Sequence, residues 1–117
     1  MIAMMSYLAD RLIQFYEDFD GFCEWIKRME AAGALKKVEI DKERQMVVMR
    51  GRVGGPTGDG IACGLSRKSI DPINNLVLLG FAFFGQYWAA MPDADEAFKK
   101  VKKWWKENLN KLRSIEP

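Results

Sequence analysis

The run LVLLGFAFFGQYWAAM at residues 76–91 decides how the rest of the chain must be arranged. Asp71 and Pro72 stand before it as a helix start, because an Asp side chain can accept from free backbone N–H groups and proline fits the first helical position. A helix that is apolar on every side has to be covered on every side. We therefore expect a helix over 72–91, ended by Pro92, whose apolar surface needs cover on all sides.

A lipid bilayer is the first environment that could cover this helix. A membrane-spanning helix takes about 20 apolar residues, whereas this run is shorter, contains Gly80, Gly85 and Gln86, and lacks basic residues at its ends. The sequence therefore predicts no membrane span.

Two other environments remain open for the same helix. It can lie in the core of one molecule, or a second copy of the chain can cover part of it. The second arrangement is plausible because a small domain has too few other residues to enclose one helix completely. Gly80, Gly85 and Ala89 would then let a neighbouring helix approach closely. Aromatic side chains are common interface anchors, and the candidates here are Phe81, Phe84, Tyr87 and Trp88.

Upstream of the apolar run, residues 8–29 carry hydrophobic side chains at alternating steps of four and three. This spacing is typical of helices that pack on helices. Asp20 and Gly21 interrupt it: either Gly21 bends one helix, at about 1 kcal/mol relative to Ala, or Asp20 caps a second helix that runs to Ala32. A single straight helix would be too long for a compact domain of this size, so we expect a break or kink.

The middle of the chain predicts three antiparallel strands. Val38 and Ile40 alternate with charged neighbours, residues 41–44 form a turn, and 46–49 return as a second strand. The glycine-rich residues 54–60 indicate another turn before a third strand at 61–65. We interpret 54–60 as a hairpin loop and not as a phosphate-binding loop, because no Gly-Lys-Ser/Thr follows and strands flank it.

The last segment predicts a helix that begins with Asp93 and Glu96 in a capping-box-like pattern. The 117 residues suit one domain, 1–117, without room for a second core. The fold class that we predict is α+β, with N-terminal helices, a three-stranded antiparallel meander, and two C-terminal helices packed on one face of the sheet.

Lysines crowd the last helix, although the net charge of the chain is only +2. These lysines could contact phosphates together with basic residues of the predicted sheet, or they could form an ordinary solvated face. Trp104 and Trp105 fall on the apolar side of the helix, so they do not form a stacking platform for bases. The candidate nucleic-acid-binding residues are Arg50, Arg52, Arg67, Lys68, Lys99, Lys103 and Lys106.

Catalysis and metal binding have little support in the sequence. The chain has no histidine, which removes the commonest general base and the His-based zinc sites. Its two cysteines, Cys23 and Cys63, have no Cys-x-x-Cys spacing, and we interpret both as reduced packing residues. We expect no enzyme activity, catalytic residue, cofactor or metal. No secretion signal is recognisable, so we expect a cytoplasmic location.

The sequence leaves three hypotheses for function. The first is a non-catalytic binding or assembly module that self-associates, as a homodimer, through the apolar helix 72–91. The second is a nucleic-acid-binding protein that uses the basic C-terminal helix. The third is a small-molecule carrier or sensor with an aromatic pocket, lined by side chains such as Phe81, Phe84, Trp88 and Trp105.

Overall fold

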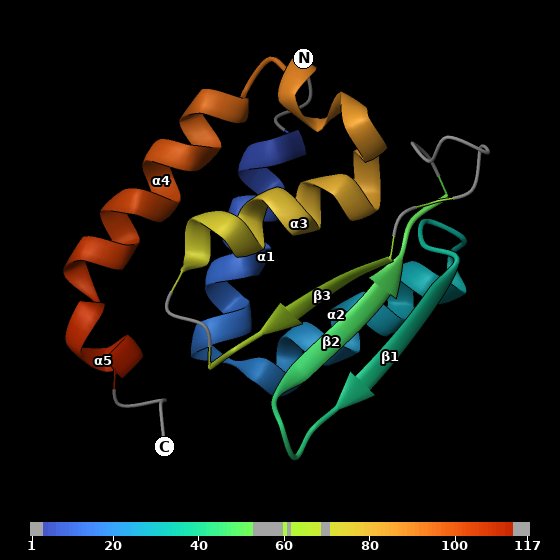
Figure 1. The fold of residues 1–117 in the computed structure, drawn as a ribbon, viewed down its shortest axis with the longest axis horizontal. Coiled ribbons are helices and arrows are strands. Elements are labelled where there is room, and N and C mark those ends of the chain that lie inside the picture. Colours follow the sequence, from blue (N-terminus) through green and yellow to red (C-terminus); the bar gives the residue numbers. More distant parts are fainter. Residues whose placement is uncertain (1–3, 53–59, 61, 69–70, 114–117) are drawn as a thin grey trace.

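The computed structural model confirms the α+β class and the order of the elements (Figure 1). It describes residues 4–52, 60, 62–68 and 71–113, so most of the glycine-rich segment 54–60 lies outside the described residues. The N-terminal helices are α1 (Met4–Glu17) and α2 (Phe19–Ala31), and the strands are β1 (Lys37–Asp41), β2 (Met46–Arg50) and β3 (Ala62–Ser66). The C-terminal part contains α3 (Pro72–Phe84), the 3-10 helix η1 (Gly85–Ala90), α4 (Ala94–Glu107) and the short α5 (Leu109–Arg113).

The predicted interruption of the first helix is a break at Asp18, two residues before the predicted cap. The Asp18 side chain accepts a hydrogen bond from the Gly21 backbone N–H at 3.1 Å, which makes Asp18 the N-cap of α2. Gly21 lies inside α2, where a Cβ would collide with the Asp18 carboxylate. Glycine is therefore needed at this position so that Asp18 can cap the helix.

The three strands form one antiparallel sheet in the order β1-β2-β3. Val48 lies at its centre, opposite Glu39 of β1 and Gly64 of β3. Alternate side chains point to opposite faces of a sheet, and the buried set here consists of Val38, Val47, Met49, Cys63 and Leu65. The other face of the sheet carries exposed positions.

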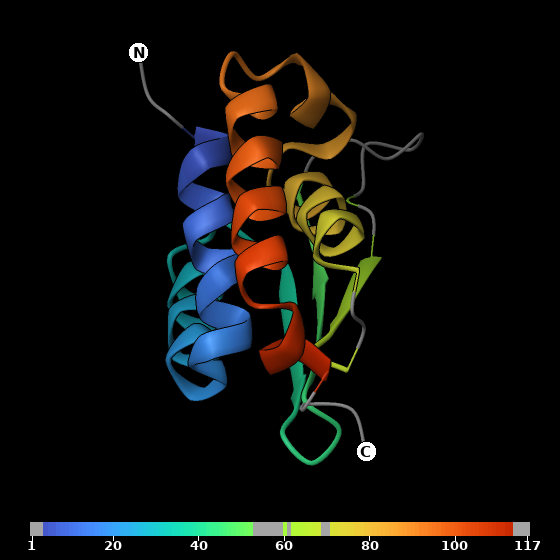
Figure 2. The ribbon, with the colours of Figure 1, turned by 90° about the vertical axis from the view of Figure 1, so that its left-hand side faces the viewer.

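Two layers make up the molecule, and α3 belongs to the same layer as the sheet. Figure 2 shows α1 and α2 on one side, α3 and the sheet on the other, and α4 alongside α1 and α3. Asn75 of α3 donates to the backbone oxygen of Ser66, at one end of β3. Near the other end, Gly51 approaches so close to α3 that a Cβ would collide with the Ala82 carbonyl oxygen. Helix α3 therefore runs antiparallel along β3.

The helix that we predicted over 72–91 is shorter than expected. The α-helix ends at Phe84, because Gly85 has φ 57°, a conformation that glycine adopts without strain, and residues 85–90 continue as a 3-10 helix. Its start agrees with the prediction, since the Asp71 side chain accepts from Asn74 N–H and Pro72 occupies the first turn. The apolar run is thus two elements that meet at an angle.

Helix α1 is bonded at both ends by charged side chains from distant parts of the chain. At its N-terminus the buried Asp93 carboxylate accepts from the backbone N–H groups of Met5 at 3.2 Å and Ser6 at 2.7 Å. At its C-terminus the Arg67 guanidinium donates through Nε and Nη2 to the Tyr16 carbonyl oxygen. Both charges have the sign that the helix dipole favours.

A closed aromatic cluster fills the space between α1 and α2. Phe15 and Phe22 have ring centroids 5.0 Å apart, Phe22 and Trp25 are 5.5 Å apart, and all three side chains are buried. Trp25 also stacks on Phe83 of α3. We call Phe15, Phe22 and Trp25 the closed cluster.

Among the described residues, no helix is both long enough and apolar enough to cross a bilayer.

Candidate interaction surface

One side of α3 is apolar and only partly buried. Val77, Phe81 and Phe84 follow one another at i, i+4 and i+7, opposite the fully buried Leu76 and Leu79. The sequence of α3 contains no charged residue. We call Val77, Phe81 and Phe84 the α3 ridge.

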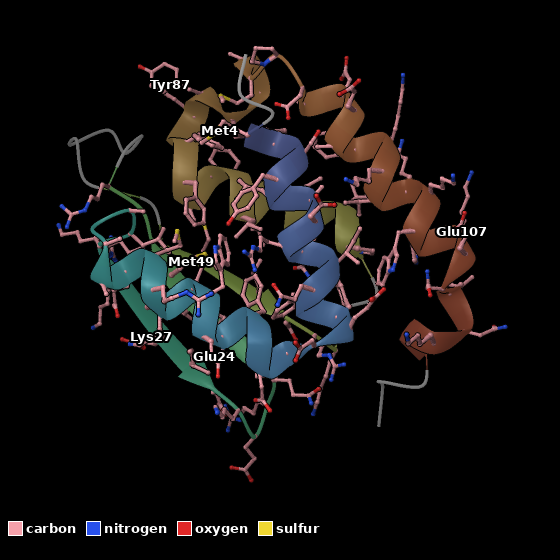
Figure 3. The ribbon with its side chains drawn as sticks, turned by 180° about the vertical axis from the view of Figure 1, so that it is seen from behind. Met4, Glu24, Lys27, Met49, Tyr87 and Glu107 are labelled. Atoms are coloured by element: carbon pink, nitrogen blue, oxygen red, sulfur yellow. The ribbon has the colours of Figure 1, made fainter. Side chains whose placement is uncertain are left out.

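A second group of aromatic side chains joins the ridge to η1 and α4. The Trp88 ring lies 5.8 Å from Phe81 and 5.6 Å from Phe98, both in edge-on geometry, and all three side chains are half-buried. We call Phe81, Trp88 and Phe98 the open cluster. Tyr87 is 59% exposed and points away from the body of the molecule (Figure 3).

Gly80 has a role inside the molecule. A Cβ there would lie 3.1 Å from both the Met5 methyl group and the Trp88 Cβ, so glycine lets α1 and η1 pack against α3. The small residue that the sequence suggested for a neighbouring helix is thus used by the chain's own elements. Gly85 is also buried, whereas Ala89 is exposed.

The outer face of the sheet is the part of this surface that sequence reasoning missed. Val48 is 40% exposed, and its β3 neighbours Ala62 and Gly64 are exposed as well. Two open hollows adjoin Val48 and Glu39: one of about 140 Å³ extends toward Lys37 and Arg50, and one of about 290 Å³ toward Asp41 and Met46. Val48 stands in the unbroken apolar run 46–49, so only the strand register shows that it faces outward.

The lysines of α4 form one stripe. Lys99, Lys102, Lys103 and Lys106 are exposed and spaced i, i+3, i+4 and i+7, which places them on one side of the helix. Among the ion pairs of the described residues, Lys100 pairs with Asp10 at 2.6 Å, while none involves these four lysines.

The basic residues in and next to the sheet do not form one continuous patch with the lysine stripe of α4. Arg50 donates to the Gly60 carbonyl oxygen at 3.0 Å, and Arg67 is bonded to the end of α1. Arg50 and Arg67 also stand at opposite ends of the strands, because Arg50 is paired with Ala62, the first residue of β3. Arg52 and Lys68 are exposed next to them.

The hollows do not coincide with the aromatic pocket of the carrier hypothesis. Besides the two on the sheet, an open hollow of about 260 Å³ lies between α2 and β1, lined by side chains that include Cys23, Lys27 and Ile40. Phe81, Phe84, Trp88 and Trp105 line none of these three. Trp105 instead packs half-buried against the core.

Burial raises the pKa of three titratable side chains among the described residues. Burial raises the pKa of both thiols, Cys23 and Cys63, which disfavours the reactive thiolate. Burial also raises the pKa of Tyr16 to about 12, although Asn75 donates a hydrogen bond to its oxygen. Within the described residues, no three cysteine or carboxylate side chains gather as metal ligands.

No protein-family model matches the chain, and neither a curated protein nor a solved structure is significantly similar to it.

Proposed function

We propose that the protein is a non-catalytic assembly module that self-associates as a homodimer through α3 and η1. The observation that supports this proposal is the α3 ridge, a partly buried apolar side of a helix that has no charged residue. Phe81, Phe84, Tyr87 and Trp88 supply the large aromatic side chains that commonly anchor interfaces.

A second copy of the chain suits this surface for a physical reason. A charged partner would be recognised through opposite charges on the ridge, and α3 offers none. Burial of apolar area is then the main favourable contribution to binding. An uncharged apolar ridge can meet the same kind of surface on a copy without leaving any charge unpaired.

The test is sedimentation velocity over a wide concentration range, with Tyr87→Glu as the interface variant. Tyr87 is 59% exposed, so this change disturbs the monomer little and places a carboxylate in the interface. Tyr7→Glu is the matched control, because Tyr7 is also an exposed tyrosine, 42% exposed, on α1. We expect the dissociation constant to rise at least about tenfold for Tyr87→Glu alone.

Two outcomes would contradict the proposal. One is a wild-type protein that sediments as a monomer at every concentration. The other is a dimer that Tyr87→Glu and Phe84→Glu weaken no more than Tyr7→Glu does. Native mass spectrometry of the same samples reads the stoichiometry independently.

The lysine stripe favours nucleic-acid binding as a second candidate function. Four ammonium groups that form no ion pair with any described residue lie along two turns of α4 and could contact neighbouring phosphates. We expect binding to DNA or RNA that is measurable at low salt and is lost in Lys103→Glu/Lys106→Glu, but retained in the control Lys42→Glu on the β1–β2 turn. Absence of binding at low salt, or equal binding by both variants, would exclude this function.

A further inference from the structure

The lysine stripe of α4 faces away from the body of the molecule. Helix α4 packs on α1 and α3 (Figure 2), and its buried residues include Ala97 and Val101. Lys99 and Lys103 each follow one of these residues by two positions, which is about 200° around a helix. The stripe lysines therefore project opposite to the packed side of α4, where a partner can reach them.

The stripe is short and has definite ends. Lys106 lies seven positions after Lys99, a distance of about 10 Å along the helix axis. Exposed carboxylates border both ends, Asp95 and Glu96 in the first turn of α4 and Glu107 directly after the last lysine of the stripe. These carboxylates would repel a polyanion beyond the ends of the stripe. The stripe therefore suits about four phosphate contacts, one for each lysine.

The elements beside α4 leave the positive charge of the stripe in excess. On the side of α1, the Asp10 carboxylate is paired with Lys100 at 2.6 Å, and Glu17 accepts from Trp104 Nε1 at 2.7 Å. On the other side, α3 contains no charged residue. A phosphate group on the stripe therefore meets ammonium groups that form no ion pair with any described residue.

The stripe lacks the features of a site that binds single strands or reads bases. Proteins that bind single strands stack the bases on aromatic side chains, but Trp104 packs its ring on Tyr16 at 5.5 Å and Trp105 packs half-buried against the core. A helix that reads base edges enters the major groove, whereas α1 and α3 flank α4 (Figure 2). The stripe itself consists of lysines, which contact phosphates as point charges.

We infer that the lysine stripe lies along the phosphate backbone of double-stranded nucleic acid and does not read its sequence. This inference rests on nucleic-acid binding, the second candidate function, and specifies the form of the ligand and the groups contacted. A duplex is stiff and holds its phosphates at fixed positions, which suits charges held in line on a packed helix. An anionic membrane suits the stripe less, because membrane-surface helices bury their apolar side in lipid and that side of α4 packs against the core.

The dependence of binding on salt counts the phosphate contacts. Each phosphate that a lysine neutralises adds about 0.9 to the slope of the log association constant against log salt concentration. Fluorescence anisotropy of a short labelled DNA duplex should therefore give a slope of magnitude about 3–4 for the wild type, and one lower by about 2 for Lys103→Gln/Lys106→Gln. The matched control Lys27→Gln/Lys42→Gln removes the same charge from α2 and the β1–β2 turn and should keep the wild-type slope. Equal slopes for the two variants would contradict the inference.

Removal of a bordering carboxylate should have the opposite effect. Glu107→Gln takes away a negative charge at the end of the stripe, and we expect duplex binding at low salt to tighten by about threefold. Glu43→Gln makes the same change in net charge at an exposed position of the β1–β2 turn and should leave the dissociation constant unchanged. Equal tightening by both variants would mean that the net charge of the protein, and not the stripe, drives binding.

The choice of ligand separates this inference from the function on which it rests. We expect two duplexes of unrelated sequence to bind alike, and the corresponding single strand to bind at least about fivefold more weakly. Tighter binding of the single strand, or a preference above about tenfold for one duplex sequence, overturns the inference and leaves nucleic-acid binding standing. No binding of any strand at low salt overturns the candidate function itself. Binding to anionic phospholipid vesicles without binding to duplexes overturns both and assigns the stripe to a membrane surface.

Discussion

The closed and open clusters consist of the same kinds of aromatic side chains but differ in how far these are buried. Phe15, Phe22 and Trp25 lie between α1 and α2 and are buried from solvent. Phe81, Trp88 and Phe98 make similar ring contacts but stay half-buried. Aromatic content alone therefore does not separate core from interface. What separates them is whether a further element of the same chain covers the rings.

Truncation inside the closed cluster has the largest expected effect. Phe22→Ala removes a fully buried ring that contacts both Phe15 and Trp25, and we expect the free energy of unfolding to fall by about 3–5 kcal/mol. Urea unfolding followed by circular dichroism measures this change, which should be the same at every protein concentration. A loss below about 1 kcal/mol would mean that the closed cluster is not the rigid core of the fold.

Asp93 connects the elements that carry the two clusters. It follows η1 in the chain, and its carboxylate accepts hydrogen bonds from the first turn of α1. Asp93→Asn keeps one acceptor but removes the negative charge at the helix N-terminus, and we expect a loss of about 1–2 kcal/mol at neutral pH. Thermal and urea unfolding measure the loss. An unchanged free energy of unfolding would show that the hydrogen bonds from α1 to Asp93 do not stabilise the fold.

The same cap predicts a pH dependence with a definite sign. Burial of Asp93 opposes its ionisation, but the backbone N–H groups of Ser6 and Met5 hold its pKa below the usual 3.8. A carboxyl group whose pKa is lower in the folded than in the unfolded state stabilises the folded protein fully when the pH is above the unfolded-state pKa. This stabilisation disappears as the pH falls through the folded-state pKa. The difference between wild type and Asp93→Asn should therefore vanish at low pH. A difference that persists there would exclude the charge as its cause.

Truncation of the α3 ridge should have a smaller effect that depends on concentration. Phe84 is only half-buried in the monomer, so we expect Phe84→Ala to cost about 1 kcal/mol at low concentration. At high concentration the loss should grow, because dimer formation adds stability to the wild type that the variant lacks. Unfolding curves at several concentrations measure it. Equal losses throughout would assign Phe84 to the core.

The smallest expected effect belongs to the lysine stripe. Lys103 and Lys106 are exposed and form no ion pair within the described residues, so Lys103→Glu/Lys106→Glu should change the free energy of unfolding by less than about 0.5 kcal/mol. Urea unfolding of this variant beside wild type measures the change. A larger loss would mean that the stripe stabilises the fold, and would remove it as a candidate binding surface.

Much of the candidate surface could be predicted from the sequence, but only on one of its two sides. Tyr87, Phe81 and Phe84 were identifiable because an all-apolar helix in a small domain is hard to cover completely. Val48 and Gly64 were not, because four consecutive apolar residues at 46–49 hide the alternation that would mark an outward-facing position. The role of Gly80 was also hidden, since its neighbours Met5 and Trp88 come from other elements.

Most of the elements were determined by the sequence alone. Asp71 with Pro72, the alternation at Val38 and Ile40, and the heptad-like spacing of α1 and α2 act over a few residues, where backbone sterics and local hydrogen bonds decide the conformation. Only the tertiary structure decided that α3 lies beside β3, and that Asp93 and Arg67 bond the two ends of α1. These contacts join residues far apart in the chain. They depend on how all the elements pack together into one core. That packing is a property of the whole molecule, and no local sequence pattern contains it.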